Sequence, residues 1–194
     1  MKQERTDFLS KILIFVGVLI LAAAVRLMVF WQWHVQTSQE QASRYVTALQ
    51  TRIPSPQGAA LEERRDNTMA VLSLDGTDFV GILEMPKFDS SLPVTANWDK
   101  MAKFPSRFSG SIYDGTMQIG CTSQDGQYSF FREISAGDAL YFTDMAGNRY
   151  QYTVTDLRYE KHIDQTTLQK RDAQLTLFVK NLYGFEYLVI YCNT

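Results

Sequence analysis

The first third of the chain holds an apolar run that constrains the fold more than any other feature. Residues 12–25 include no polar side chain, and residues 27–31 extend the run past Arg26. A helix over residues 12–33 would be about 33 Å long at ~1.5 Å per residue, enough to cross a bilayer core of ~30 Å. Trp31 and Trp33 suit the aromatic belt at a membrane interface, and the stem of Arg26 could reach the headgroups. The run therefore predicts a transmembrane anchor over residues 12–33.

A cleavable signal peptide is the alternative interpretation of this segment. Residues 1–11 carry three basic side chains, and the alanines at 22–24 offer a small-residue cleavage site. Cleavage there would leave the apolar residues 25–31 as the new N-terminus, so we expect an uncleaved anchor. With either interpretation, positive charge precedes the span, and the positive-inside rule places residues 1–11 in the cytoplasm. The chain is thus predicted to cross the cell membrane once, with its C-terminal domain outside the cytoplasm.

The segment after the anchor predicts a second helix and a linker, together covering residues 34–70. Apolar side chains recur there at helical spacing, namely Ala42, Tyr45, Val46 and Leu49. This pattern predicts an amphipathic juxtamembrane helix over residues 35–52. Pro54 and Pro56 should end it, because proline lacks the amide donor and restricts the residue before it. The polar residues 57–70 are typical of a linker.

From residue 71 onward the pattern changes to short strands. Asp75-Gly76 and Gly147-Asn148 are turn dipeptides between alternating runs. Residues 139–142 and 150–154 are expected to form a hairpin around the second turn. Several short strands at this spacing indicate a barrel or a sandwich. Residues 71–194 are therefore predicted to form one mainly β domain.

Charge and composition exclude some classes of ligand. From His34 onward the chain has 15 Lys plus Arg and 19 Asp plus Glu, a formal charge of −4. No basic stripe is available to neutralise phosphates, so we expect no nucleic-acid partner. Two histidines and two cysteines scattered along the chain make no metal-binding pattern, and we expect neither a metal nor another cofactor.

A series of short motifs points to a known family. In chain order they are Gly81-Ile82-Leu83-Glu84-Met85-Pro86, Leu92-Pro93-Val94, Pro105-Ser106-Arg107-Phe108-Ser109-Gly110-Ser111, Ser135-Ala136-Gly137-Asp138, Phe142-Thr143-Asp144-Met145-Ala146-Gly147-Asn148 and Leu175-Thr176-Leu177-Phe178-Val179-Lys180. This order resembles the small sortases of class B or D, Cys-dependent transpeptidases of Gram-positive cell surfaces. The resemblance implies an eight-stranded sortase-like β-barrel with short helices. Within the connection 160–172 we expect a short helix around residues 165–169. In such a fold Cys121 and Cys192 would lie at different ends of the barrel, so we expect no disulfide between them.

The resemblance also indicates where catalysis would occur, and all three positions are altered. In the sortases the strand corresponding to residues 175–180 ends in the nucleophilic Cys, where this chain has Lys180. The next strand opens with an essential Arg, which corresponds to Tyr187. The His of a Gly-His-Asn turn corresponds to Cys121.

Each replacement removes one part of sortase chemistry. Lysine is a cation at neutral pH, and its attack on a peptide would give a stable isopeptide amide. Cysteine lacks the acid–base nitrogens of histidine, and tyrosine donates one neutral hydrogen bond where arginine offers a charged fork. Losing a nucleophile alone costs on the order of 10⁶ in rate in a serine protease. We therefore expect a sortase fold without sortase activity.

Three functions are compatible with these residues. The first is an inactive accessory that binds a sorting-signal peptide, a pilin or an active sortase. The second is a structural barrel within a cell-envelope assembly. The third is a rewired cysteine transpeptidase or hydrolase in which Lys180 deprotonates Cys121, as in Ser–Lys hydrolases. His162 lies in the connection that borders the sortase groove, and we expect it to be an exposed loop residue and not a substitute base.

Overall fold

The computed structural model divides into two compact units, residues 1–37 and residues 38–194. It describes the residues 2–54, 68–98, 103–121, 129–164, 168, 173–180 and 186–194, with side chains along the first helix described for 13–30 and from 39 onward. The greater part of the predicted linker and of the predicted helix at 165–169 lies outside the described residues. Leu168 of that helix is described, and it is helical and buried.

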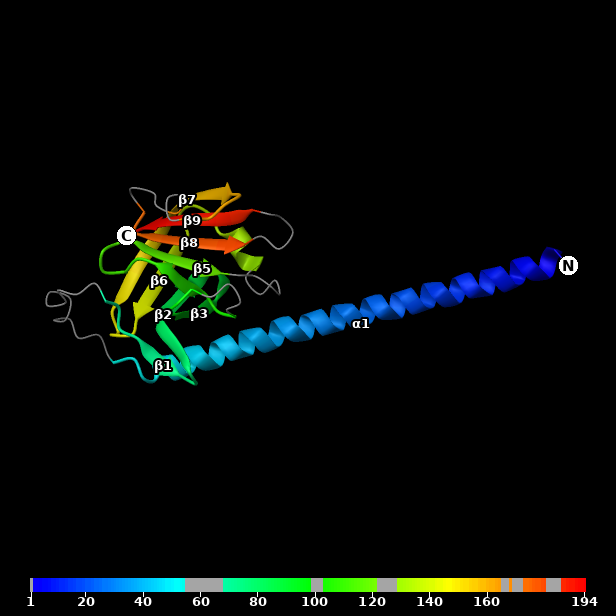
Figure 1. Cartoon of the computed structure of the whole chain (residues 1–194), viewed down its shortest axis with the longest axis horizontal. Helices are drawn as coiled ribbons and strands as arrows, with labels where there is room; N and C mark the ends of the chain where they lie inside the picture. Colours follow the sequence, from blue (N-terminus) through cyan, green and yellow to red (C-terminus); the bar gives the residue numbers. More distant parts are fainter. Residues whose placement is uncertain are drawn as a thin grey trace. The chain divides into compact units, whose positions relative to one another are not determined.

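One helix, α1 (Lys2–Gln50), includes both predicted helices without a break (Figure 1). Residues 34–41 contain no proline or glycine, so nothing in the sequence ends the first helix before the second begins. Within the first unit, Leu13–Phe30 is long and apolar enough to cross a membrane, and all its side chains are exposed. A signal sequence has the same character, so both interpretations are consistent with this segment. The bounds 12–33 for an anchor stay a prediction.

In the second unit the end of α1 packs on the barrel through the side chains of its predicted apolar spacing. Ala42, Val46 and Leu49 are buried along one face of the helix. The chain turns after Gln50, where the amide of Ile53 donates to the Leu49 carbonyl at 2.9 Å. Pro54 follows at the predicted end. This last part of α1 is therefore integral to the β domain.

The described residues of the β domain form nine strands and two short 3₁₀ helices. They are β1 (Leu72–Leu74), β2 (Thr77–Met85), η1 (Pro86–Phe88), β3 (Ser90–Thr95), β4 (Ser106–Ser109), β5 (Met117–Cys121), η2 (Ser129–Glu133), β6 (Ala139–Asp144), β7 (Arg149–Glu160), β8 (Leu175–Lys180) and β9 (Tyr187–Asn193). Eight of them close into a barrel in the order β2-β3-β4-β5-β8-β9-β7-β6, and pairing of β6 with β2 completes it. The strand β1 extends the sheet beside β2. The predicted eight-stranded, mainly β fold is confirmed.

The hairpin predicted around Gly147-Asn148 is confirmed as β6 and β7, which are antiparallel. Its turn is fixed by Asp144, a fully buried carboxylate. Asp144 accepts the amides of Ala146 and Asn148 at 2.9 and 2.8 Å, and the hydroxyl of Tyr113 at 3.0 Å. A buried carboxylate needs such donors, because its desolvation is otherwise unfavourable.

Candidate functional site

The three positions singled out by sequence come together at one end of three neighbouring strands. Parallel strands β5 and β8 place Cys121 beside Val179, and antiparallel strands β8 and β9 place Lys180 beside Tyr187. The strands lie in the order β5-β8-β9, so the three residues occupy adjacent strand ends. Their assignment as degenerate catalytic positions stays a prediction that rests on the sequence resemblance.

Cys121 points into the barrel. Its side chain is 1% exposed and belongs to the interior cluster that also contains Ile119 and Val179. Burial raises the pKa of the Cys121 thiol far above its usual range, because the charged thiolate would lose its hydration. The thiol is therefore protonated at neutral pH, and the thiolate is the reactive form of cysteine.

The hypothesis that Lys180 deprotonates Cys121 requires the two side chains to lie on the same face of the barrel wall. Side chains alternate between the two faces along a strand, so Lys180 points to the face opposite Val179. Val179 is buried in the interior with Cys121, whereas Lys180 is exposed. The thiol and the ammonium thus lie on different faces of the barrel wall, and this geometry does not support a Cys121–Lys180 dyad.

The second cysteine, Cys192 on β9, lies beside the opposite end of β8 from Cys121. Cys192 pairs with Leu175 at the start of β8, and Cys121 pairs with Val179 near its end. Four residues of strand separate the two pairs, roughly 13 Å at ~3.3 Å per residue, which is too far for a disulfide. Both thiols are free, in agreement with the expectation that they lie at different ends.

On the outer face, Phe178 of β8 and Tyr187 of β9 meet two aromatic side chains from elsewhere, Phe108 of β4 and Trp98 after β3. We call these four residues the outer aromatic cluster. The Phe178 ring lies at its centre, with ring centroids 5.3 Å from Trp98, 5.3 Å from Phe108 and 6.3 Å from Tyr187. The contacts to Phe108 and Tyr187 are edge-to-face, a favoured arrangement of aromatic rings. Phe178 is 1% exposed, whereas the other three rings are only partly buried.

Gly120 allows this cluster to form. A Cβ atom on Gly120 would clash with the rings of Trp98 and Phe178. The glycine thus lets both rings lie directly on the backbone of β5, next to Cys121. Sequence reasoning missed this role and the cluster as a whole. The available signal was strand alternation, which puts Phe178 on the same face as Lys180.

The rim of this face is polar. Lys180 is exposed at the end of β8, and Glu160, the last residue of β7, pairs with Tyr187 on the other side of β9. His162 follows two residues later and is exposed, as expected for a loop histidine. Among the described residues, no group of three His, Cys, Asp or Glu side chains could hold a metal ion.

Similar solved structures are sortases. Sortase C-3 from Streptococcus pneumoniae is 17% identical with a TM-score of 0.53, covering 82% of this chain and 82% of its own. A Clostridium perfringens sortase D5 transpeptidase is 10% identical with a TM-score of 0.53, covering 81% of this chain and 98% of its own. Sortase C from Clostridium perfringens, solved with the C-terminal cell wall sorting motif, is 15% identical with a TM-score of 0.51. The match covers 78% of this chain and 90% of that sortase. No protein-family model and no curated protein matches the chain. At these identities the likeness shows that the chain has the sortase fold.

Proposed function

We propose that this sortase-fold protein is catalytically inactive and acts by binding a peptide, as an accessory to protein anchoring at a Gram-positive cell wall. Residues 12–33 would hold it in the cell membrane, with the barrel outside the cytoplasm. The observation that carries the proposal is the burial of Cys121. The thiol points into the barrel core, is protonated at neutral pH and lies on the other face of the wall from Lys180.

The remaining groups on the outer face supply little chemistry. An exposed lysine is a poor nucleophile while it carries its proton, and its acyl product would be a stable amide. Tyr187 offers one neutral hydroxyl where an oxyanion needs charged or multiple donors. Without the thiolate, the imidazole and the guanidinium, the three described positions at these strand ends lack the groups that a transpeptidation cycle needs.

The same face is suited to binding. The outer aromatic cluster offers partly exposed rings, and Lys180 adds a cation at its edge. Aromatic side chains, Trp and Tyr above all, are enriched among the residues that dominate the binding energy of protein interfaces. One sortase of similar fold was solved with a sorting motif, which supports a peptide as the ligand. A pilin or a partner sortase that presents such a segment would use the same face.

Binding is tested with the full chain in lipid nanodiscs and an LPxTG-type sorting peptide. We expect saturable shifts of amide resonances of β5, β8 and β9, centred on Gly120 and Lys180. Lys180→Ala should weaken the affinity several-fold, because a charge-assisted contact to the peptide is lost. The matched control is Arg52→Ala, which removes an exposed cation at the end of α1. Absence of shifts at millimolar peptide would contradict peptide binding and favour a purely structural barrel.

A further inference from the structure

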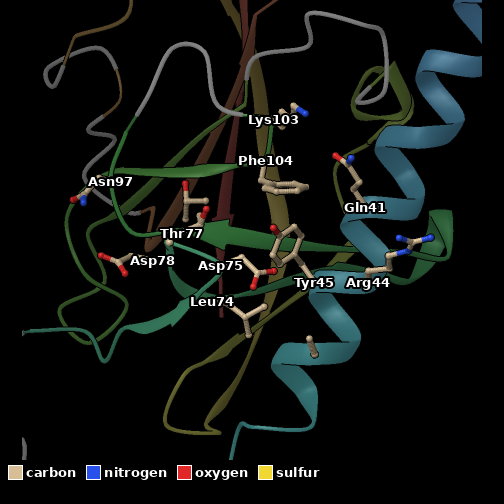
Figure 2. Close-up of a pocket in the computed structure, with 13 residues that line it drawn as sticks. Gln41, Arg44, Tyr45, Leu74, Asp75, Thr77, Asp78, Asn97, Lys103 and Phe104 are labelled. Atoms are coloured by element: carbon tan, nitrogen blue, oxygen red, sulfur yellow. The ribbon is translucent and has the colours of Figure 1, made fainter.

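The domain also contains a large open pocket that none of the four side chains of the outer aromatic cluster lines (Figure 2). Its volume is about 850 Å³, within the range of ligand sites in proteins. Four segments that are distant in sequence line it: the end of α1 (41–48), the β1–β2 turn (74–78), the end of β3 with residue 97, and residues 103–104. None of these residues has a role in the proposed peptide site.

The floor of the pocket is aromatic and rigid. Tyr45 and Phe104 form an edge-to-face pair with centroids 5.4 Å apart, and both rings are partly exposed. Phe79, which is fully buried, supports them from below at 5.4 and 6.3 Å. Figure 2 shows the two rings side by side, with Gln41 of the helix on one side and Asp75 of the turn on the other. A ligand would meet a preformed apolar surface that costs little entropy to order.

The rim of the pocket is polar, and its charges balance. Carboxylates, a guanidinium, an ammonium and amides are contributed by Asp75, Asp78, Arg44, Lys103, Gln41 and Asn97. Asp75 is held in a left-handed conformation with φ 51°, followed by Gly76 at 77°, so its carboxylate sits on a fixed turn. Among the described residues, no hydrogen bond or ion pair engages the side chains of Asp75 and Arg44.

This lining selects one class of ligand by its chemistry. Two carboxylates and two cations cancel, so neither a phosphate-rich nor a polycationic ligand gains from the field of the pocket. A charged rim and a small aromatic floor disfavour an acyl chain, whose burial would desolvate the charges. A sugar is suited to both the polar rim and the aromatic floor. Its adjacent hydroxyls pair with planar carboxylate, amide and guanidinium groups, and its C–H face packs on an aromatic ring.

We propose that the pocket between the end of α1 and the β1–β2 turn binds a neutral oligosaccharide. The proposal goes beyond the proposed peptide binding and does not depend on it. The Asp75 carboxylate accepts hydrogen bonds from sugar hydroxyls, Gln41 and Asn97 donate and accept at the rim, and the Tyr45–Phe104 pair packs against the apolar face of one ring.

The test uses the full chain in nanodiscs, titrated with two soluble tetrasaccharides of the same linkage. One is the β-1,4-linked tetramer of N-acetylglucosamine and the other is the corresponding tetramer of glucose, which lacks the acetamido groups. Isothermal titration calorimetry and saturation-transfer NMR should show saturable binding of at least one. Asp75→Asn should weaken it about tenfold, since a hydrogen bond to a charged acceptor is replaced by one to a neutral amide. Tyr45→Phe, which removes one hydroxyl and keeps the ring, should weaken it by a smaller factor.

Asp89→Asn is the matched control. Asp89 is also exposed and left-handed, with φ 46°, and lies outside this pocket, in the turn between η1 and β3. Asparagine tolerates this conformation well, so both variants should keep the fold. The proposal is overturned if neither tetrasaccharide binds saturably, or if Asp75→Asn and Asp89→Asn have equal effects. Displacement of a bound saccharide by the sorting peptide would also overturn it, since the pocket would then be a peptide site.

Discussion

The inner and outer faces of β5, β8 and β9 differ in what they can contribute to function. The inner face holds Cys121 and Val179, sealed in an apolar core. The outer face holds Phe178 and Lys180, where an aromatic cluster borders an exposed cation. Neighbouring residues of the same strand therefore meet opposite environments, an apolar interior and water.

This difference underlies the proposal that the protein keeps a binding surface on a sortase fold without carrying out the sortase reaction. A thiol reacts as a thiolate, and the thiolate needs solvent or a nearby cation. The only thiol near the site lies on the face that offers neither. The groups on the solvent face are suited to contacts with a ligand. The following predictions test this contrast, in order of decreasing effect on stability.

Phe178→Ala should have the largest effect, because it removes the ring at the centre of the outer aromatic cluster. Truncating a buried phenylalanine lowers the free energy of unfolding by ~3–5 kcal/mol. Urea denaturation of the full chain in nanodiscs, followed by near-UV circular dichroism, measures it. Tyr187→Phe keeps its ring and serves as the control. A loss below ~1 kcal/mol for Phe178→Ala would show that the cluster is not packed as described.

The two buried thiols should make stability depend on alkaline pH. Burial raises the pKa of Cys121 and of Cys192. Below the ordinary thiol pKa of about 8.5, folded and unfolded chains are equally protonated and the thiols add no pH dependence. Above it, the unfolded chain loses protons that the folded chain keeps. The free energy of unfolding should therefore fall by up to ~1.4 kcal/mol per pH unit for each thiol.

This pH dependence is checked by denaturation at pH 8 to 10 for the native chain and a Cys121→Ala/Cys192→Ala variant. The variant should lose stability less steeply over this range, whatever its absolute stability. Iodoacetamide at pH 7 should also label both cysteines much more slowly in the folded chain than in urea. Fast labelling of Cys121 alone would place its thiol in an activating environment. It would contradict the placement of the Cys121 side chain on the inner face of the barrel.

Gly120→Ala should destabilise the domain by ~1–3 kcal/mol, because the new methyl group clashes with Trp98 and Phe178. Trp98→Leu shortens one of the two clashing side chains. In a double-mutant cycle the two substitutions together should lower the free energy of unfolding by less than the sum of their separate effects. Strict additivity would mean that Gly120 and Trp98 do not touch.

Lys180→Ala should leave the free energy of unfolding within ~0.5 kcal/mol of the native value, because the side chain is exposed. The same variant is expected to bind the sorting peptide more weakly. Thermal unfolding and peptide titration of one sample separate the two effects. A large loss of stability would assign Lys180 a structural role and weaken the contrast between the faces.

The fold and the location of the site could be predicted from sequence more readily than the site's orientation. Turn dipeptides such as Gly147-Asn148 and the proline at 54 act locally, so the hairpin and the helix end followed directly. The strand β5 reads Met-Gln-Ile-Gly-Cys, which puts Cys121 on one face with Met117 and Ile119, but both faces of the strand are buried, so the pattern alone does not say which face is the barrel interior. The saccharide pocket was beyond sequence reasoning, because distant segments such as 41–48 and 103–104 form it only after folding.

The most direct test of the central claim is a transpeptidation assay. The full chain in nanodiscs is incubated with an LPxTG-type peptide, with and without an amine acceptor, and products are followed by mass spectrometry. Cys121→Ala and Cys192→Ala are run in parallel, since both remove a buried free thiol from the same barrel. The inactive-barrel account predicts no cleavage and no transfer for any of the three proteins. Cleavage by the native chain that persists in Cys192→Ala and is lost in Cys121→Ala would contradict it.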